Sequence, residues 1–236
     1  MILYHNMSYI LQIETATTVC SVALAKDGKL IATKQVDQRN IHAEVITLYI
    51  DELIILAGIK YSDVDAIAVS SGPGSYTGLR IGVSTAKGLC YALDKPLIGI
   101  ETLEAMANGV IANRDIAVDT LLCPMIDARR MEVYTALFDG AGNKLKDTAA
   151  EIIDADSFSE QLKINKVLFF GDGAEKCREV LGGDPNALFL TDFINSAEHL
   201  TRKAFEKFTA KNFEDVAYFE PYYLKEFLVT TSKKQA

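Results

Sequence analysis

The sequence contains few of the residues from which metal centres and disulfide frameworks are built. Its 236 residues include three histidines and four cysteines. The cysteines lie far apart and form no C-x-x-C pair, a spacing typical of a reducing compartment: Cys20, Cys90, Cys123 and Cys177. We therefore expect no preformed cysteine–histidine metal site.

A surplus of positive charge and long apolar runs are also missing. Lys and Arg number 24 against 32 Asp and Glu, which gives a formal net charge of −8. This balance disfavours free-standing nucleic-acid binding, although a local basic patch remains compatible with it. No run reaches the roughly 18 apolar residues of a membrane span. Residues 1–14 show no basic segment, apolar core or cleavage site of a signal peptide, so we expect a cytoplasmic protein without a membrane segment.

Strand-like and helix-like segments alternate along the first half of the chain, where apolar residues are frequent. Strand patterns cover 9–15, 20–28, 29–37, 65–71 and 96–101. Helix patterns cover 42–58, 76–93 and 102–113. Asn40 is expected to cap the first helix and Gly58 to end it. The order β-β-β-α-β-α-β-α predicts a layered α/β fold.

The second half of the chain is less regular. Strand patterns cover 121–128, 132–140 and 166–171, and helix patterns cover 174–182 and 197–211. Ser157 with Glu160 predicts a capping box for a short helix, and Asn195 with Glu198 predicts a cap for the last long one. We predict two subdomains, at residues 1–113 and 114–236.

A glycine-rich stretch, SSGPGSYTGLRIG at 70–82, lies between the fourth strand pattern and the second helix pattern. It matches neither the G-x-x-x-x-G-K-[ST] loop nor the G-x-G-x-x-G fingerprint. The N-terminus of the following helix still offers N–H groups to an anion. Two interpretations therefore stay open, an anion-binding loop and a turn that only shapes the start of the helix, and we favour the second.

The helix pattern at 42–58 is more apolar than one buried face requires. The apolar stripe along this helix is widened on both sides by further apolar residues. This excess indicates either that the helix is buried on two sides within one domain or that it contacts another subunit. The next helix carries small residues, which allow a neighbouring helix to approach closely. The candidate partner-interface residues are Val45, Leu48, Tyr49, Ile55, Tyr76, Arg80, Gly82 and Ala86.

Several motifs together resemble the bacterial TsaB (YeaZ) family. GPGSYTGLRIGVSTAKGL occurs in order with LQIETATTVCSVAL, PLIGIETL, IDARRMEVY and PYYLK, between about residues 9 and 225. The resemblance implies the actin-like, sugar-kinase and Hsp70-type fold with two subdomains. It also implies a non-catalytic partner of TsaD that acts with TsaE, in a complex that places threonylcarbamoyl on adenosine 37 of tRNA. Such proteins pair with TsaD through helices of the first subdomain, can form homodimers, and reach tRNA only through the complex.

The resemblance permits two comparisons with catalytic relatives. TsaD proteins carry H-x-x-x-H where Thr102 and Met106 stand here, and neither residue is a good ligand for iron or zinc. Kinases of the superfamily have a glycine-containing phosphate hairpin where residues 14–18 read ETATT. We expect no metal, no catalytic residue and no cofactor in this chain, with ATP or ADP only at the contact with TsaD. The candidate nucleotide-binding or anion-binding residues are Glu14, Thr15, Gly72, Gly74, Gly171 and Gly173.

Other functions remain compatible with the sequence. Asp127, Arg129 and Arg130 predict a structural ion pair with interface contacts. A self-sufficient enzyme, either metallopeptidase-like or a small-molecule kinase, is one alternative function. A homodimeric binding module, in which the same apolar helices pair with themselves, is another.

Overall fold

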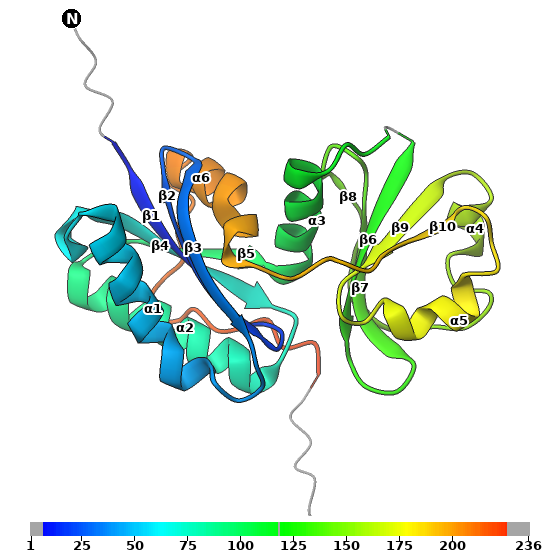
Figure 1. Ribbon diagram of the computed structural model, residues 1–236, viewed down its shortest axis with the longest axis horizontal. Coiled ribbons are helices and arrows are strands. Elements are labelled where there is room, and N and C mark those ends of the chain that lie inside the picture. Colours follow the sequence, from blue (N-terminus) through cyan, green and yellow to red (C-terminus); the bar gives the residue numbers. More distant parts are fainter. Residues whose placement is uncertain (1–6, 118, 226–236) are drawn as a thin grey trace, which may run out of the picture.

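The computed structural model describes residues 7–117 and 119–225, which form two α/β halves (Figure 1). Residues 1–6, 118 and 226–236 lie outside the described residues, and so does part of the start from which we expect no signal peptide. The strands are β1 (Tyr9–Glu14), β2 (Val19–Lys26), β3 (Lys29–Asp37), β4 (Val64–Gly72), β5 (Leu97–Glu101), β6 (Thr120–Asp127), β7 (Glu132–Phe138), β8 (Lys144–Ile152), β9 (Lys166–Phe170) and β10 (Ala187–Leu190). The α-helices are α1 (His42–Ala57), α2 (Tyr76–Leu93), α3 (Thr102–Asn113), α4 (Ser159–Leu162), α5 (Arg178–Leu181) and α6 (Thr201–Thr209). Short 3₁₀-helices are η1 (Tyr61–Asp63), η2 (Glu175–Cys177) and η3 (Ala197–Leu200).

The two halves share one sheet topology. The first five-stranded sheet has the order β3-β2-β1-β4-β5, and the second has the order β10-β9-β6-β7-β8. In the first sheet β1 pairs antiparallel with β2 and parallel with β4. In the second sheet β6 pairs antiparallel with β7 and parallel with β9. The second sheet, taken from β8 to β10, therefore repeats the strand order of the first.

The first sheet is covered on both faces, which explains the nearly continuous apolar runs of β1 and β4. On one face Leu11 and Ile67 pack with Leu53 of α1 and Val83 of α2. On the other face, strand residues pack against η3 and α6, with Leu200 in the cluster. Helix α3 lies between the two sheets, and its buried side chains join the core of the second half (Figure 1).

The chain returns to the first sheet after completing the second. Residues 213–225, the C-terminal strap, continue from α6 along β5 and α2. The Glu214 N–H donates to the Leu97 carbonyl at 2.9 Å, and Lys87 Nζ donates to the carbonyls of Ala217 and Phe219 at 3.1 and 2.9 Å. Residues 197–225 therefore contact the first sheet although the predicted boundary places them in the second subdomain; the division at residue 113 stays a prediction.

The sequence predicted one helix end correctly and three helix caps wrongly. Gly58 ends α1 in the left-handed conformation, with φ of 66°, as predicted. The Asn40 cap is wrong, because α1 begins after Ile41 without a side-chain cap. The Ser157 box is wrong, because Ser157 Oγ bonds Asp154 and α4 begins only after Phe158. The Asn195 cap is also wrong: Asn195 Oδ1 accepts from the adjacent Ser196 N–H, and η3 begins after Ser196.

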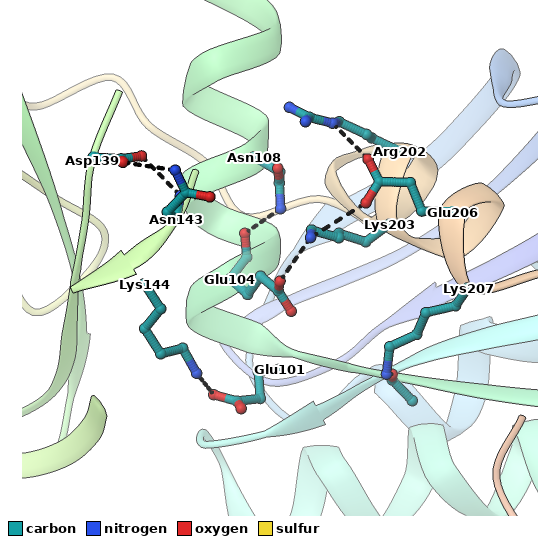
Figure 2. A network of polar contacts seen from close by, with 11 residues as sticks. Glu101, Glu104, Asn108, Asp139, Asn143, Lys144, Arg202, Lys203, Glu206 and Lys207 are labelled. Carbon is teal, nitrogen blue, oxygen red and sulfur yellow. Dashed lines mark hydrogen bonds and ion pairs between the residues drawn. The ribbon is translucent and has the colours of Figure 1, made fainter. Parts of the chain in front are cut away.

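Polar contacts link elements of both halves around the first turns of α3 (Figure 2). Glu101 accepts from Lys144 of β8 at 2.7 Å. Glu104 forms an ion pair with Lys203 of α6 at 3.2 Å. The second half is therefore joined to the first through α3 and through the strands on either side of it. In the described part of the chain, no helix is long and apolar enough to cross a membrane.

Candidate functional site

The glycine loop packs against the loop that follows β1. We call residues 14–18 and 72–78 together the glycine junction. The Ser75 N–H at the start of α2 donates to the Ala16 carbonyl at 2.7 Å. His42 Nε2, in the first turn of α1, lies 3.1 Å from the Thr17 carbonyl. Both apolar helices therefore begin at this junction and run from the same edge of the sheet.

The glycines of the junction allow backbone to meet backbone. A Cβ atom on Gly74 would overlap the Ala16 carbonyl oxygen, and one on Gly78 would overlap that of Thr15. Gly72 has φ of 117° and lies against the Tyr222 carbonyl of the strap, 2.6 Å from where its Cβ would stand. These positions require glycine because a side chain would push the segments apart.

Backbone N–H groups at the start of α2, which an anion would need as hydrogen-bond donors, are already bonded within the chain. The Ser75 N–H is bonded to Ala16, and the Gly78 N–H donates to Ser75 Oγ at 3.2 Å. A helix N-terminus binds anions through N–H groups that have no partner of their own. The geometry thus favours the interpretation that the glycines shape the start of α2.

Glu14 is the buried acid of the junction. Its Oε1 accepts from the Ala16 N–H at 2.6 Å and from Ser70 Oγ at 2.9 Å. Burial raises the pKa of this carboxyl from its ordinary value of 4.5 to about 7, although these hydrogen bonds and the neighbouring Asn195 oppose the rise. Glu14 Oε2 and Thr15 Oγ1 have no hydrogen-bond partner within the described part of the chain. Glu14 therefore changes protonation near neutral pH.

The second half repeats this arrangement where β9 ends. Gly171 has φ of 103°, and a Cβ atom there would overlap the Met125 carbonyl oxygen. A Cβ atom on Gly173 would lie 2.8 Å from the Ile126 carbonyl carbon. The structure brings Glu14, Thr15, Gly72 and Gly74 together, whereas Gly171 and Gly173 pack on β6. Nucleotide binding by these six residues stays a prediction.

Asp127, at the end of β6, forms its ion pair with Lys176. Its Oδ1 also accepts from the Arg129 backbone N–H at 2.9 Å. These contacts lower the pKa of Asp127 below its ordinary value, although burial opposes them. The predicted ion pair therefore exists with a different cation, and neither Arg129 nor Arg130 forms a salt bridge with a described residue.

The two positions compared with the histidines of TsaD belong to the core. Thr102 and Met106 are fully buried in α3. The methyl carbon of Met106 lies 2.6 Å from where a Cβ on Gly171 would stand, so α3 packs closely against the second glycine turn. Among the residues described, no group of three or more His, Cys, Asp or Glu is placed to hold a metal ion.

The outer surface of α1 and the end of α2 carries large apolar side chains. Four of them form what we call the apolar face: Leu48 (57% exposed), Ile55 (77%), Leu56 (67%) and Tyr91 (87%). The predicted interface residues Val45 and Tyr49 are half-buried against the chain's own core. On α1 the exposed acidic residues Glu44, Asp51 and Glu52 alternate with these apolar residues. Single exposed apolar residues are ordinary, whereas several large ones on neighbouring helices are typical of a contact surface.

Gly82 and Ala86 are wrong as surface candidates. Gly82 lies against Thr15, where a Cβ atom would overlap the threonine Oγ1, and Ala86 is fully buried. The small residues of α2 thus serve its packing on the first sheet. Tyr76 is half-buried and Arg80 exposed, with the guanidinium carbon 5.6 Å from the centroid of the Tyr76 ring.

A cavity of about 420 Å³ lies between β3, α3 and the segment before η3. Arg114 and Asp192 form an ion pair at 2.6 Å at this cavity. His199 stacks on Phe193, with ring centroids 5.2 Å apart, and burial lowers the pKa of His199 to about 4. No local sequence pattern predicts this cavity, because its lining comes from segments far apart in the chain.

Two sheets of one topology, with a glycine turn at the same place in each, define an actin-like α/β protein. YeaZ from Pseudomonas aeruginosa has this fold, with a TM-score of 0.78 and 24% identity over 92% of this chain and all of that one. The activator of 2-hydroxyisocaproyl-CoA dehydratase from Clostridium difficile, solved with ADPNP, is a more distant structural neighbour, with a TM-score of 0.50 and 11% identity over 89% of this chain and 98% of that one. These likenesses confirm the predicted fold class.

Sequence comparison assigns the family. The family model of TsaD, tRNA N6-adenosine threonylcarbamoyltransferase, matches residues 35–226. TsaB of Bacillus subtilis is 31% identical over 92% of this chain and 93% of its own. TsaB of Escherichia coli is 39% identical over 54% of this chain, a match that spans about half (53%) of the relative. The chain belongs to the TsaB (YeaZ) family, as the motifs predicted.

Proposed function

We propose that this chain is an accessory, non-catalytic subunit in the formation of threonylcarbamoyladenosine at position 37 of tRNA, and that it pairs with TsaD. The E. coli and B. subtilis relatives are named tRNA threonylcarbamoyladenosine biosynthesis proteins. The match of this chain to the TsaD family model supports a partnership between two subunits of related fold. TsaE is the further protein partner we propose, and tRNA is engaged by the assembled complex.

The apolar face is the observation that carries the proposal. Leu48 and Ile55 lie seven residues apart on α1, so they share one side of the helix, and both are exposed. In the first half α1 and α2 already cover the sheet with their buried sides. The exposed apolar side is therefore surplus to the fold of this chain, and a TsaD subunit is the partner that would bury it.

A supporting role agrees with the chemistry of the glycine junction. Its glycines, Ser75 and Glu14 make contacts within the chain, and Thr102 and Met106 occupy core positions in α3. We propose that any ATP or ADP binds where this chain meets TsaD. In that arrangement the junction fixes the position of α1 and α2 for the partner.

The test is reconstitution with purified TsaD, TsaE and tRNA. Ile55→Glu combined with Leu48→Glu places two charges on the apolar face, and we expect at least a hundredfold weaker pairing with TsaD and a matching loss of tRNA modification. Ile152→Glu combined with Ile164→Glu is the matched control, because both residues are similarly exposed (73% and 82%) but lie in the second half. The control should pair and modify as the wild type does.

Three outcomes would contradict the proposal. Full modification by TsaD and TsaE without this chain would remove the need for an accessory subunit. Unaided ATP turnover or metal-dependent hydrolysis by the isolated chain would favour the self-sufficient enzyme. A homodimer that resists TsaD and is broken by the same two substitutions would favour the homodimeric binding module, which the apolar face also fits.

A further inference from the structure

Two arginines stand side by side at the tip of the hairpin between β6 and β7. Arg129 and Arg130 are exposed, and neither forms an ion pair with a described residue. The nearby Asp127 is engaged by Lys176. Asp127 also attracts Arg129, but Asp127 and Glu132 are each paired with a lysine, so in a chain with a net charge of −8 the two arginines leave a local surplus of positive charge at this tip.

The backbone of this tip is costly for arginine. Arg129 has φ of +74° and Arg130 has φ of +51°, so both are left-handed. Glycine, asparagine and aspartate adopt that conformation more readily than arginine does. Folding stability alone would favour glycine at both positions. The presence of arginine therefore indicates that the two guanidinium groups have a function other than stabilising the fold.

The C-terminal strap brings tyrosines to the same edge. The Tyr223 ring lies on Tyr76, with centroids 4.7 Å apart. The Tyr222 N–H donates to the Ser71 carbonyl at 2.7 Å, which fixes this end of the strap on the glycine loop. Tyr222 and Tyr223 remain partly exposed, at 43% and 37%.

The strap also joins the two halves at this place. Lys225 forms an ion pair with Glu132 at the start of β7, and the Glu132 N–H donates to the Arg129 carbonyl at 3.1 Å. Arg80 lies over the opposite end of the tyrosine pair, beside Tyr76. These contacts connect Arg80, Tyr222, Tyr223, Arg129 and Arg130 through the strap, and we call these five residues the basic edge.

We propose that the basic edge is an RNA-binding surface, through which this chain contacts the tRNA within the complex. The inference rests on the proposed function. Guanidinium groups pair with phosphates in a fork geometry and stack on bases, and tyrosine rings stack on unpaired bases. A surface that combines guanidinium groups with tyrosine rings is better suited to bind a single-stranded or looped RNA segment than to bind an uncharged surface of another protein.

The basic edge and the apolar face can be occupied together. α1 and α2 begin at the glycine junction, and Arg80 lies in the first turns of α2. Ile55, Leu56 and Tyr91 of the apolar face lie in the last turns of their helices, and Leu48 lies in the second turn of α1. The proposal requires that a subunit seated on the apolar face leave Arg129 and Arg130, in the β6–β7 hairpin of the second half, uncovered. The overall negative charge explains why this chain alone would bind RNA weakly.

The experiment uses the complex with TsaD and fluorescently labelled tRNA at several salt concentrations. Arg129→Glu combined with Arg130→Glu should weaken tRNA binding at least tenfold and reduce the slope of log K against log salt by roughly one to two. Lys29→Glu combined with Lys166→Glu is the charge-matched control. Both lysines are exposed and have no ion pair with a described residue, and this control should lose little affinity.

A second variant separates RNA contact from folding. Arg129→Gly combined with Arg130→Gly removes both side chains and supplies the residue that the left-handed backbone prefers. It should fold like the wild type, show the same thermal midpoint within a few degrees, and still bind tRNA about tenfold more weakly.

The outcomes distinguish this inference from the proposed function. If the wild-type chain fails to pair with TsaD, the proposed function fails. If pairing is intact and both double variants bind tRNA with unchanged affinity and salt slope, the RNA surface is overturned. It is overturned equally if the variants lose binding of TsaE or of ATP while tRNA affinity stays at the wild-type value.

Discussion

The two halves of the molecule have the same strand order but very different crossover connections. In the first half α1 and α2, of 16 and 18 residues, join the strands. At the equivalent places the second half has α4, of four residues, and the short η2 and α5. Both sheets are complete, so the longer helices are not needed to connect a sheet of this kind. Their additional length carries the apolar face.

The strand ends of the two halves differ in a similar way. Glu14 ends β1 and Asp127 ends β6, and each carboxylate accepts from the backbone N–H two residues further on. Glu14 is buried beneath the start of α2, whereas Asp127 is exposed. One motif thus serves as a buried support in the first half and as a surface feature in the second. The difference follows from the helix that covers it.

The largest effect is expected where the glycine junction has no space. Gly78→Ala should lower the free energy of unfolding by more than about 3 kcal/mol, because the new methyl group meets the Thr15 carbonyl. Gly88→Ala, on the same helix with nothing within 4 Å, should raise stability by up to about 1 kcal/mol. Urea unfolding measures both. Equal stabilities would show that the junction is not tightly packed.

The next effect comes from Glu14. Its pKa is raised in the folded state to about 7, so its contribution to stability is present below pH 4.5 and is lost as pH rises towards 7. Glu14→Gln should therefore stabilise the protein by about 2 to 3 kcal/mol above pH 7 and leave it unchanged near pH 4. The measurement is the free energy of unfolding as a function of pH.

Asp127 provides the matched comparison with Glu14. The pKa of Asp127 is lowered, so its contribution has the opposite sign: it is present at neutral pH and is lost as pH falls. Asp127→Asn should cost less than about 1 kcal/mol at pH 7, because the ion pair is partly exposed. If both substitutions changed stability in the same direction at pH 7, the two strand ends would not differ as described.

How far the sequence predicted the fold also differs between the halves. The elements of the first half were predictable because its helices are long enough to show their period and Gly58 ends one of them. In the second half β8 and β10 were not predicted. β8 has no fully buried residue to give a clear alternation, and β10 has only four residues. The pattern at 174–182 breaks into η2 and α5.

The site was predictable where the signal was local. The glycine loop was identified as the start of a helix because its residues follow one another in the chain. The contact of Gly72 with Tyr222 joins distant segments and leaves no local pattern. For the same reason the cap of η3 was missed: Ser21 Oγ of β2 accepts from the Ala197 N–H at 3.0 Å.

The smallest effect is expected where polar side chains join the two halves. Glu101 accepts from Lys144 at 2.7 Å (Figure 2). It also accepts from Thr148 at 2.9 Å, but its side chain is 36% exposed. Glu101→Gln should lower the free energy of unfolding by less than about 1 kcal/mol, because partly solvated ion pairs contribute little. Met106→Ala, in the buried contact of α3 with the second half, should cost about 2 to 5 kcal/mol. Urea unfolding at low and high salt separates the two, since only the ion pair is screened. A Glu101→Gln cost as large as that of Met106→Ala would mean that charge, and not the apolar core around α3, joins the halves.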